Sequence, residues 1–100
     1  MKSKLQNRLD SGLSAITAEI MPPRGGNSSC AISKALALNN LVHGFNVTDG
    51  SRAIMRMSSL ALCKLLLEAN LEPVLQLSCR DRNRIALQAE LLGAHALGIK

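Results

Sequence analysis

Three apolar segments, each ending in a polar residue, recur at intervals of about 30 residues, and this spacing constrains the fold more than any other feature of the chain. The polar residues are Glu19, Thr48 and Ser78. A loop and then a run with apolar residues at three- and four-residue steps follow each of them, which is typical of a helix. One strand and its helix take about 30 residues, and such units wind right-handed into a parallel sheet. The sequence therefore predicts the α/β class.

The pattern predicts three βα units over residues 14–100, preceded by a leader or capping helix over residues 1–13. The predicted strands cover residues 15–21, 44–48 and 74–78. The predicted helices end near Asn39, cover 60–69, and cover 84–92 with Gly93 as the stop. The predicted capping residues are Ser28 or Ser29, Ser58, and Asp81 or Asn83.

Residues 94–100 lead toward a fourth strand that is not complete. Three strands are too few for a flavodoxin-like domain, and a (β/α)₈ TIM barrel takes about 250 residues. We therefore expect residues 1–100 to be the N-terminal βα repeats of a single TIM-barrel domain, truncated before the fourth strand is complete. Such a piece leaves sheet edges open, so we expect it to be unstable and inactive by itself.

Composition excludes several classes of protein. The chain is 47% hydrophobic, and no apolar run is long enough to span a membrane. The net charge is +5, but one Phe and no Tyr or Trp leave little for nucleic-acid bases to stack on, so no nucleic-acid partner is expected. Three cysteines without CxxC spacing and two histidines predict no metal site, and reduced thiols favour a cytoplasmic location.

In parallel α/β folds, functional groups gather at the carboxyl ends of the strands. Glu19 is either the solvated end of a strand or an acid at the barrel mouth. The Thr48-Asp49-Gly50 segment is either a turn or part of a site. The alternating Arg80, Arg82 and Arg84 either bind an anion or form a solvated network with Asp81, and we expect Arg80 to point inward and Arg84 outward.

Cysteine and histidine positions favour structural roles. Cys30 and Cys63 fall on helix faces where a small hydrophobic residue is expected, and only Cys79 reaches a strand end. His43 precedes a strand and His95 lies near a helix end, so both are expected on the face of the sheet opposite the site.

Three ordered motifs resemble those of the methylenetetrahydrofolate reductase family, a family of flavoprotein (β/α)₈ barrels. They are Glu19-Ile20-Met21-Pro22-Pro23, Asn46-Val47-Thr48-Asp49-Gly50 and Gln76-Leu77-Ser78-Cys79. In that family an acidic residue and Pro-Pro end the first strand, Val-Thr-x-Gly ends the second, and a His-Leu-Thr-Cys-like segment ends the third. The resemblance extends in register over nearly the whole chain.

This resemblance implies FAD as cofactor, NADH or NADPH as electron donor, and 5,10-methylenetetrahydrofolate as the substrate reduced to 5-methyltetrahydrofolate. Glu19 matches the catalytic acid, which must stay partly protonated near neutral pH to help open the folate imidazolidine ring. Thr48, Asp49, Gly50, Ser51 and Gln76 match the segments beside the flavin and nicotinamide. One-carbon metabolism, tetrahydrofolate interconversion and methionine biosynthesis follow from the same resemblance.

The sequence also departs from the family pattern. Gln76 stands where the family usually has a flavin-contacting His, and Asp49 replaces a common aromatic residue. We expect Arg80 to meet an anionic end of the cofactor or folate. The alternatives are a folate- or corrinoid-associated methyltransferase barrel and a noncatalytic α/β binding subunit. A homo-oligomer of the full-length protein is compatible with each of these functions.

Overall fold

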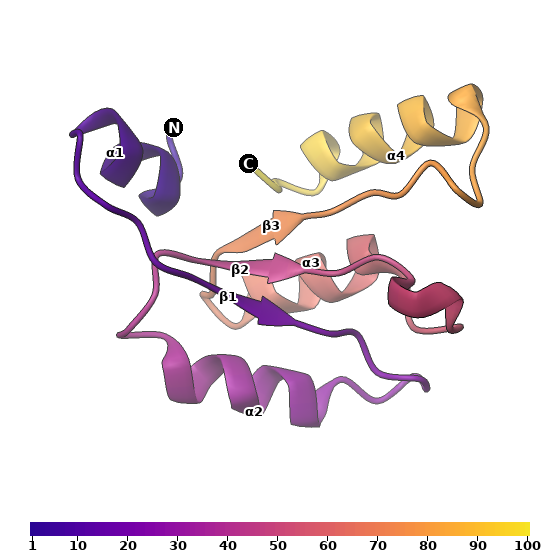
Figure 1. The fold of residues 1–100 in the computed structure, drawn as a ribbon, viewed down its shortest axis with the longest axis horizontal. Helices are drawn as coiled ribbons and strands as arrows, with labels where there is room; N and C mark the ends of the chain where they lie inside the picture. The colour runs from indigo at the N-terminus through magenta and orange to yellow at the C-terminus, as the bar shows by residue number, and fades with distance from the viewer.

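A computed structural model describes residues 1–100, and it contains three strands, four α-helices and one short 3₁₀-helix (Figure 1). In chain order the elements are α1 (Lys4–Asp10), β1 (Thr17–Ile20), α2 (Ser29–Leu38), β2 (Gly44–Val47), η1 (Ser51–Ala53), α3 (Ser59–Glu68), β3 (Pro73–Leu75) and α4 (Arg84–Ala96). After α1, a helix therefore follows each strand. The predicted α/β class and the βα repeats of a barrel-like architecture are confirmed.

The three strands form one parallel sheet in the order β1-β2-β3. Glu19 on β1 pairs with Asn46 on β2, and Asn46 pairs with Val74 on β3. The strands run in one direction in Figure 1, so their carboxyl ends share one edge of the sheet. The loops that follow β1, β2 and β3, which contain the predicted site residues, lie at that edge.

The core lies between the sheet and the helices α2 and α3. Phe45 and Val47 of β2 are 1% and 0% exposed, and they belong to one apolar cluster with Leu62 and Leu66 of α3. Side chains alternate across a strand, so Glu19 and Asn46 lie on the other face, which neither α2 nor α3 covers. One face of the sheet thus stabilises the fold, while the other presents polar groups.

Helix α1 lies at the amino-terminal ends of the strands, opposite the loops of the candidate site (Figure 1). The backbone N–H of Lys4 donates a hydrogen bond to the Glu72 carboxylate, just before β3. The Leu5 side chain lies 3.8 Å from the position that a Cβ on Gly44 would occupy, so α1 covers the start of β2.

All three strands are shorter than predicted, β2 by only one residue, and the last helix is longer. β1 and β3 end at Ile20 and Leu75, because the following residues enter loops. The prediction that Gly93 stops the last helix is wrong, since α4 continues to Ala96. The helix ends at Ala96, and Gly98 just beyond it has φ +86°. The backbone N–H groups of Gly98 and Ile99 bond to the carbonyls of His95 and Ala94.

Helix capping largely follows the prediction. Ser58 accepts a hydrogen bond from the Ala61 N–H and Asn83 from the Ala86 N–H. Ser28 precedes α2 without a side-chain capping bond, and Asn27 accepts from the Ser29 N–H instead. None of these helices has the length and apolar character required to cross a membrane.

Candidate functional site

The carboxyl ends of the three strands bring together the residues predicted for the site. Glu19 is exposed on the open face of β1, Thr48 is buried at the end of β2, and Gln76 is exposed after β3. The ladder continues past the strands, since the Thr48 N–H bonds to the Ile20 carbonyl and the Gln76 N–H to the Val47 carbonyl. The structure therefore places the three predicted positions on adjacent strand ends.

Glu19 lies beside a small polar row on the open face. Its neighbour in register, Asn46, donates from Nδ2 to Thr17 Oγ1 at 2.9 Å, which orients the Asn46 amide. Glu19 also lines a cleft of about 370 Å³ between the end of β1 and α2, together with Lys34 of α2 and Arg56. A carboxyl group accessible from this face can exchange a proton with a molecule bound there.

Thr48 carries a buried hydroxyl without a hydrogen-bond partner. The residue is 6% exposed, and its Oγ1 is buried from solvent. A buried polar group without a partner costs about 1 to 3 kcal/mol, so native proteins rarely retain one without a reason.

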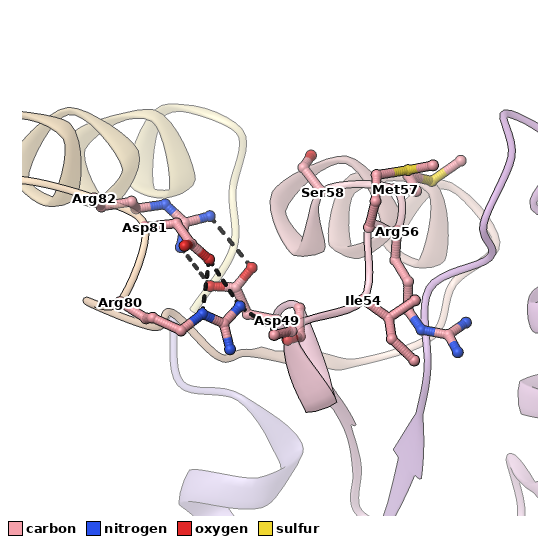
Figure 2. A pocket seen from close by; sticks show the side chains of 11 residues that line it. Asp49, Ile54, Arg56, Met57, Ser58, Arg80, Asp81 and Arg82 are labelled. Carbon is pink, nitrogen blue, oxygen red and sulfur yellow. Dashed lines mark hydrogen bonds and ion pairs between the residues drawn. The ribbon is translucent and has the colours of Figure 1, made fainter.

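Asp49 and Arg82 form a partly buried ion pair between the loops that follow β2 and β3 (Figure 2). Their side chains are 13% and 18% exposed. Arg82 donates to Asp49 from Nη1 and, at 3.3 Å, from Nη2, and the Ser78 N–H donates to Asp49 Oδ2 at 2.6 Å. Three donors thus occupy the Asp49 carboxylate.

The surroundings of Asp49 keep it ionised. Burial by itself raises the pKa of Asp49, but the hydrogen bonds from Arg82 and Ser78 and the charges of Arg82 and Arg80 outweigh it, so the pKa lies below its usual value. The hydrogen bond to Asp49 likewise raises the pKa of Arg82. A lowered acid pKa means that the pair stabilises the fold at neutral pH and loses this contribution as the pH falls through that pKa.

The arginine that turns inward is Arg82, and the expectation that Arg80 does so is wrong. The Arg80 side chain is 46% exposed, more than twice as much as that of Arg82, and it bonds to the neighbouring Asp81 and to the Gly50 carbonyl. Arg84 is exposed at the start of α4, as expected. A second cleft, of about 400 Å³, separates this arginine cluster from Ile54 and Met57 (Figure 2).

The turn at Gly50 depends on the absence of a side chain. Its φ is +56°, and the Arg80 Nη2 lies 2.9 Å from the position a Cβ would take. The space beside Gly50 thus receives the Arg80 guanidinium, which donates to the Gly50 carbonyl at 3.0 Å.

Gly50→Ala is expected to lower the free energy of unfolding of the full-length protein by roughly 1 to 2 kcal/mol, because an L residue is strained at this φ. The Arg80 side chain is flexible and can move aside, so backbone strain is the larger effect. Denaturant unfolding measures the change. Gly25→Ala is the matched control, since no atom lies within 4 Å of its added Cβ, and equal losses in both variants would contradict the role given to the Gly50 conformation.

Several contacts at this edge were not predicted from the sequence. Arg56 Nη1 donates to the Pro22 carbonyl at 3.0 Å, and the Ser59 hydroxyl donates to the Gln76 carbonyl at 3.0 Å. The sequence predicts an inward-pointing arginine after β3, although it assigns this role to Arg80, but no local pattern distinguishes Arg56 from a surface arginine.

Cys30 lines the cleft beside Glu19 and Cys79 follows β3, but neither thiol forms a hydrogen bond there. Cys63 is fully buried in α3, and burial raises the pKa of its thiol to about 12, so it is an inert core residue. Cys30, expected on a buried helix face, is exposed, as is Cys79. His43 accepts a hydrogen bond from the Ile16 N–H before β1, a structural role at the opposite edge.

Comparison with known proteins agrees with the motifs at the strand ends. Residues 4–100 match the family model described as methylenetetrahydrofolate reductase. No match is found among curated proteins. The family consists of oxidoreductases of one-carbon metabolism, which are generally flavin-dependent and act on folate. Because the match covers nearly all of its residues, the chain belongs to the methylenetetrahydrofolate reductase family.

Proposed function

We propose that the full-length protein reduces 5,10-methylenetetrahydrofolate to 5-methyltetrahydrofolate, with FAD as cofactor and NAD(P)H as electron donor. The family supports this proposal, and the observation that carries it to this chain is the alignment of Glu19, Thr48 and Gln76 on adjacent strand ends. In the balanced reaction, NAD(P)H loses a hydride, and the folate methylene carbon gains it. The bond from that carbon to one ring nitrogen breaks, and this nitrogen gains a proton.

The residues at the strand ends fit a flavin. The Thr48 hydroxyl is buried without a partner and could bond to a polar edge of the ring system. Gln76 offers an exposed amide from the neighbouring strand, and Ser51 lies in the turn after Gly50. The Asp49 carboxylate is already occupied by donors of the chain, so its contribution to cofactor binding is indirect. Bound FAD would supply hydride transfer between NAD(P)H and the folate.

Glu19 is the proposed proton donor. Glu19 lies on the open face of the sheet, in register with Asn46 and away from the apolar core. A protonated Glu19 would give its proton to the ring nitrogen that leaves the methylene carbon, so that the carbon becomes electrophilic enough to accept hydride.

We propose a cytoplasmic location, in keeping with the reduced thiols.

Arg80 is the proposed contact for an anionic group of the cofactor or folate. Its guanidinium is half-exposed at the 400 Å³ cleft, although Asp81 already neutralises part of its charge. Arg80→Ala in the full-length protein is expected to weaken binding of FAD or of the folate, because it removes a positively charged hydrogen-bond donor from the cleft. Titration of FAD and of the folate measures this. Arg84→Ala is the control, because Arg84 is exposed, and equal small losses in both variants would mean that the arginines are only a solvated cluster.

The decisive test of the function uses purified full-length protein. We expect a yellow bound flavin, and NAD(P)H oxidation that depends on 5,10-methylenetetrahydrofolate. A colourless protein that transfers a methyl group from a folate or corrinoid would instead establish the methyltransferase alternative. Binding of a folate without turnover or flavin would favour a noncatalytic subunit.

A further inference from the structure

The segment between β2 and α3, residues 48–58, is hydrogen-bonded to the loop that follows β1. Arg56 donates to the Pro22 carbonyl at 3.0 Å, and the Met57 N–H donates to the Pro23 carbonyl at 2.8 Å. In Figure 2 the Arg56 guanidinium points away from the Asp49 cluster. These two bonds fix the segment to the chain that immediately follows Glu19.

The same region is bonded to the chain after β3. Asp49 accepts from the Ser78 N–H, and the hydroxyl of Ser59, at the start of α3, donates to the Gln76 carbonyl. Ser59 is 1% exposed, so water does not compete for its hydrogen bond. The backbone on both sides of Leu77 is therefore held by groups that follow β2.

Arg82 completes this connection. Its Nη1 donates to Asp49 and also, at 3.0 Å, to the Ser78 carbonyl. One guanidinium therefore joins Asp49, which follows Thr48, to Ser78, which lies two positions after Gln76. The planar fork of Arg suits such a bridge, and the low exposure of the pair limits screening by solvent.

We propose that Asp49 and Arg82 are positioning residues for the reaction proposed above, on which this inference rests. The pair holds Thr48 and Gln76 in a fixed relation and does not contact the reactants. Oδ2 of Asp49 accepts from Arg82 Nη1 and from the Ser78 N–H, and Oδ1 accepts from Arg82 Nη2. The Asp49 carboxylate therefore has little capacity left to bind a ligand. Reacting groups misplaced by about 1 Å lose roughly 100-fold in rate, so cutting this bridge should affect turnover.

The test compares Arg82→Met with Arg84→Met in the full-length protein. Arg84 is exposed and forms no ion pair, so its replacement controls for the loss of a nearby positive charge. Arg82→Met is expected to lower kcat about 100-fold with little change in KM, while FAD remains bound. Amide hydrogen exchange at Gln76 and Ser78 should accelerate in Arg82→Met only. Arg82→Lys, which keeps the charge without the fork, should restore part of kcat.

A second variant guards against failure to fold, because Arg82→Met leaves the partly buried Asp49 charge without its partner. Asp49→Asn combined with Arg82→Met removes both charges and keeps an acceptor for the Ser78 N–H. The double variant is expected to fold, with the same loss of kcat and the same faster exchange.

The outcomes separate this inference from the proposed function. Unchanged kcat in Arg82→Met, or in the double variant if the single one does not fold, would overturn the positioning role. Lower kcat with unchanged exchange would also overturn it, because Arg82 would then act on a reactant directly. If the wild-type protein oxidises no NAD(P)H with the folate, the proposed function fails, and the exchange rates at Gln76 and Ser78 alone decide whether the pair fixes these loops.

Discussion

Glu19→Gln in the full-length protein is expected to bind FAD and accept electrons from NAD(P)H as the wild type does, but to lose reoxidation by 5,10-methylenetetrahydrofolate. The amide keeps the shape of the side chain, but it cannot donate the proton that ring opening requires. Loss of a general acid typically costs roughly 100- to 10,000-fold in rate. Stopped-flow absorbance of the flavin in the two half-reactions measures each step separately.

The matched control is Glu68→Gln, at the end of α3, where the carboxylate is exposed and pairs only with Lys64 at 3.9 Å. This variant should leave both half-reactions unchanged. An oxidative half-reaction of normal rate in Glu19→Gln would remove Glu19 from the role of acid. A slowed reductive half-reaction in the same variant would show that Glu19 instead affects the binding of the flavin or of NAD(P)H.

Residues 1–100 expressed alone are expected neither to retain FAD nor to unfold cooperatively. Only 15 of the 100 residues are buried, and the core cluster lies on one side of the sheet. Leu92 and Ile85 of α4 are 73% and 70% exposed, and Leu41 is 66% exposed. Neither β1 nor β3 has a strand on its outer side, so both leave backbone groups unpaired.

Calorimetry and analytical ultracentrifugation of these 100 residues provide the measurement. A broad transition or association into larger species is expected, because association is the simplest way to cover the exposed apolar side chains. The full-length protein, under the same conditions, is the control and should show a sharp transition. A sharp transition from a monomer of residues 1–100 would contradict the prediction and indicate a complete small α/β module.

The sequence predicts the order of the elements well because strand ends and helix caps are local signals. The polar residues after each apolar run mark the edge where the site lies, and Ser58 and Asn83 cap helices through bonds to residues three positions ahead. The prediction at Gly93 was wrong because a glycine inside a helix costs only about 1 kcal/mol. Gly98, with its left-handed φ, lies just past the end of α4 instead.

The geometry of the site could not be predicted in the same way. Asp49 and Arg82 are 33 residues apart in the chain, and whether Arg80 or Arg82 meets Asp49 depends on the path of the loop after β3. Proximity to the strand favoured Arg80, but Arg80 instead occupies the space beside Gly50. Such a choice depends on side-chain directions in three dimensions, which hydrophobic periodicity does not encode.

The bonds on both sides of the β2–α3 segment also limit how its length can change during evolution. Surface loops usually tolerate insertions and deletions because few contacts depend on their length. Here Asp49 must reach Ser78 in the loop after β3, and Arg56 must reach Pro22 in the loop after β1. A residue inserted or deleted between them would displace one of the two contacts. We therefore expect relatives that keep both contacts to vary in the sequence of this loop more readily than in its length.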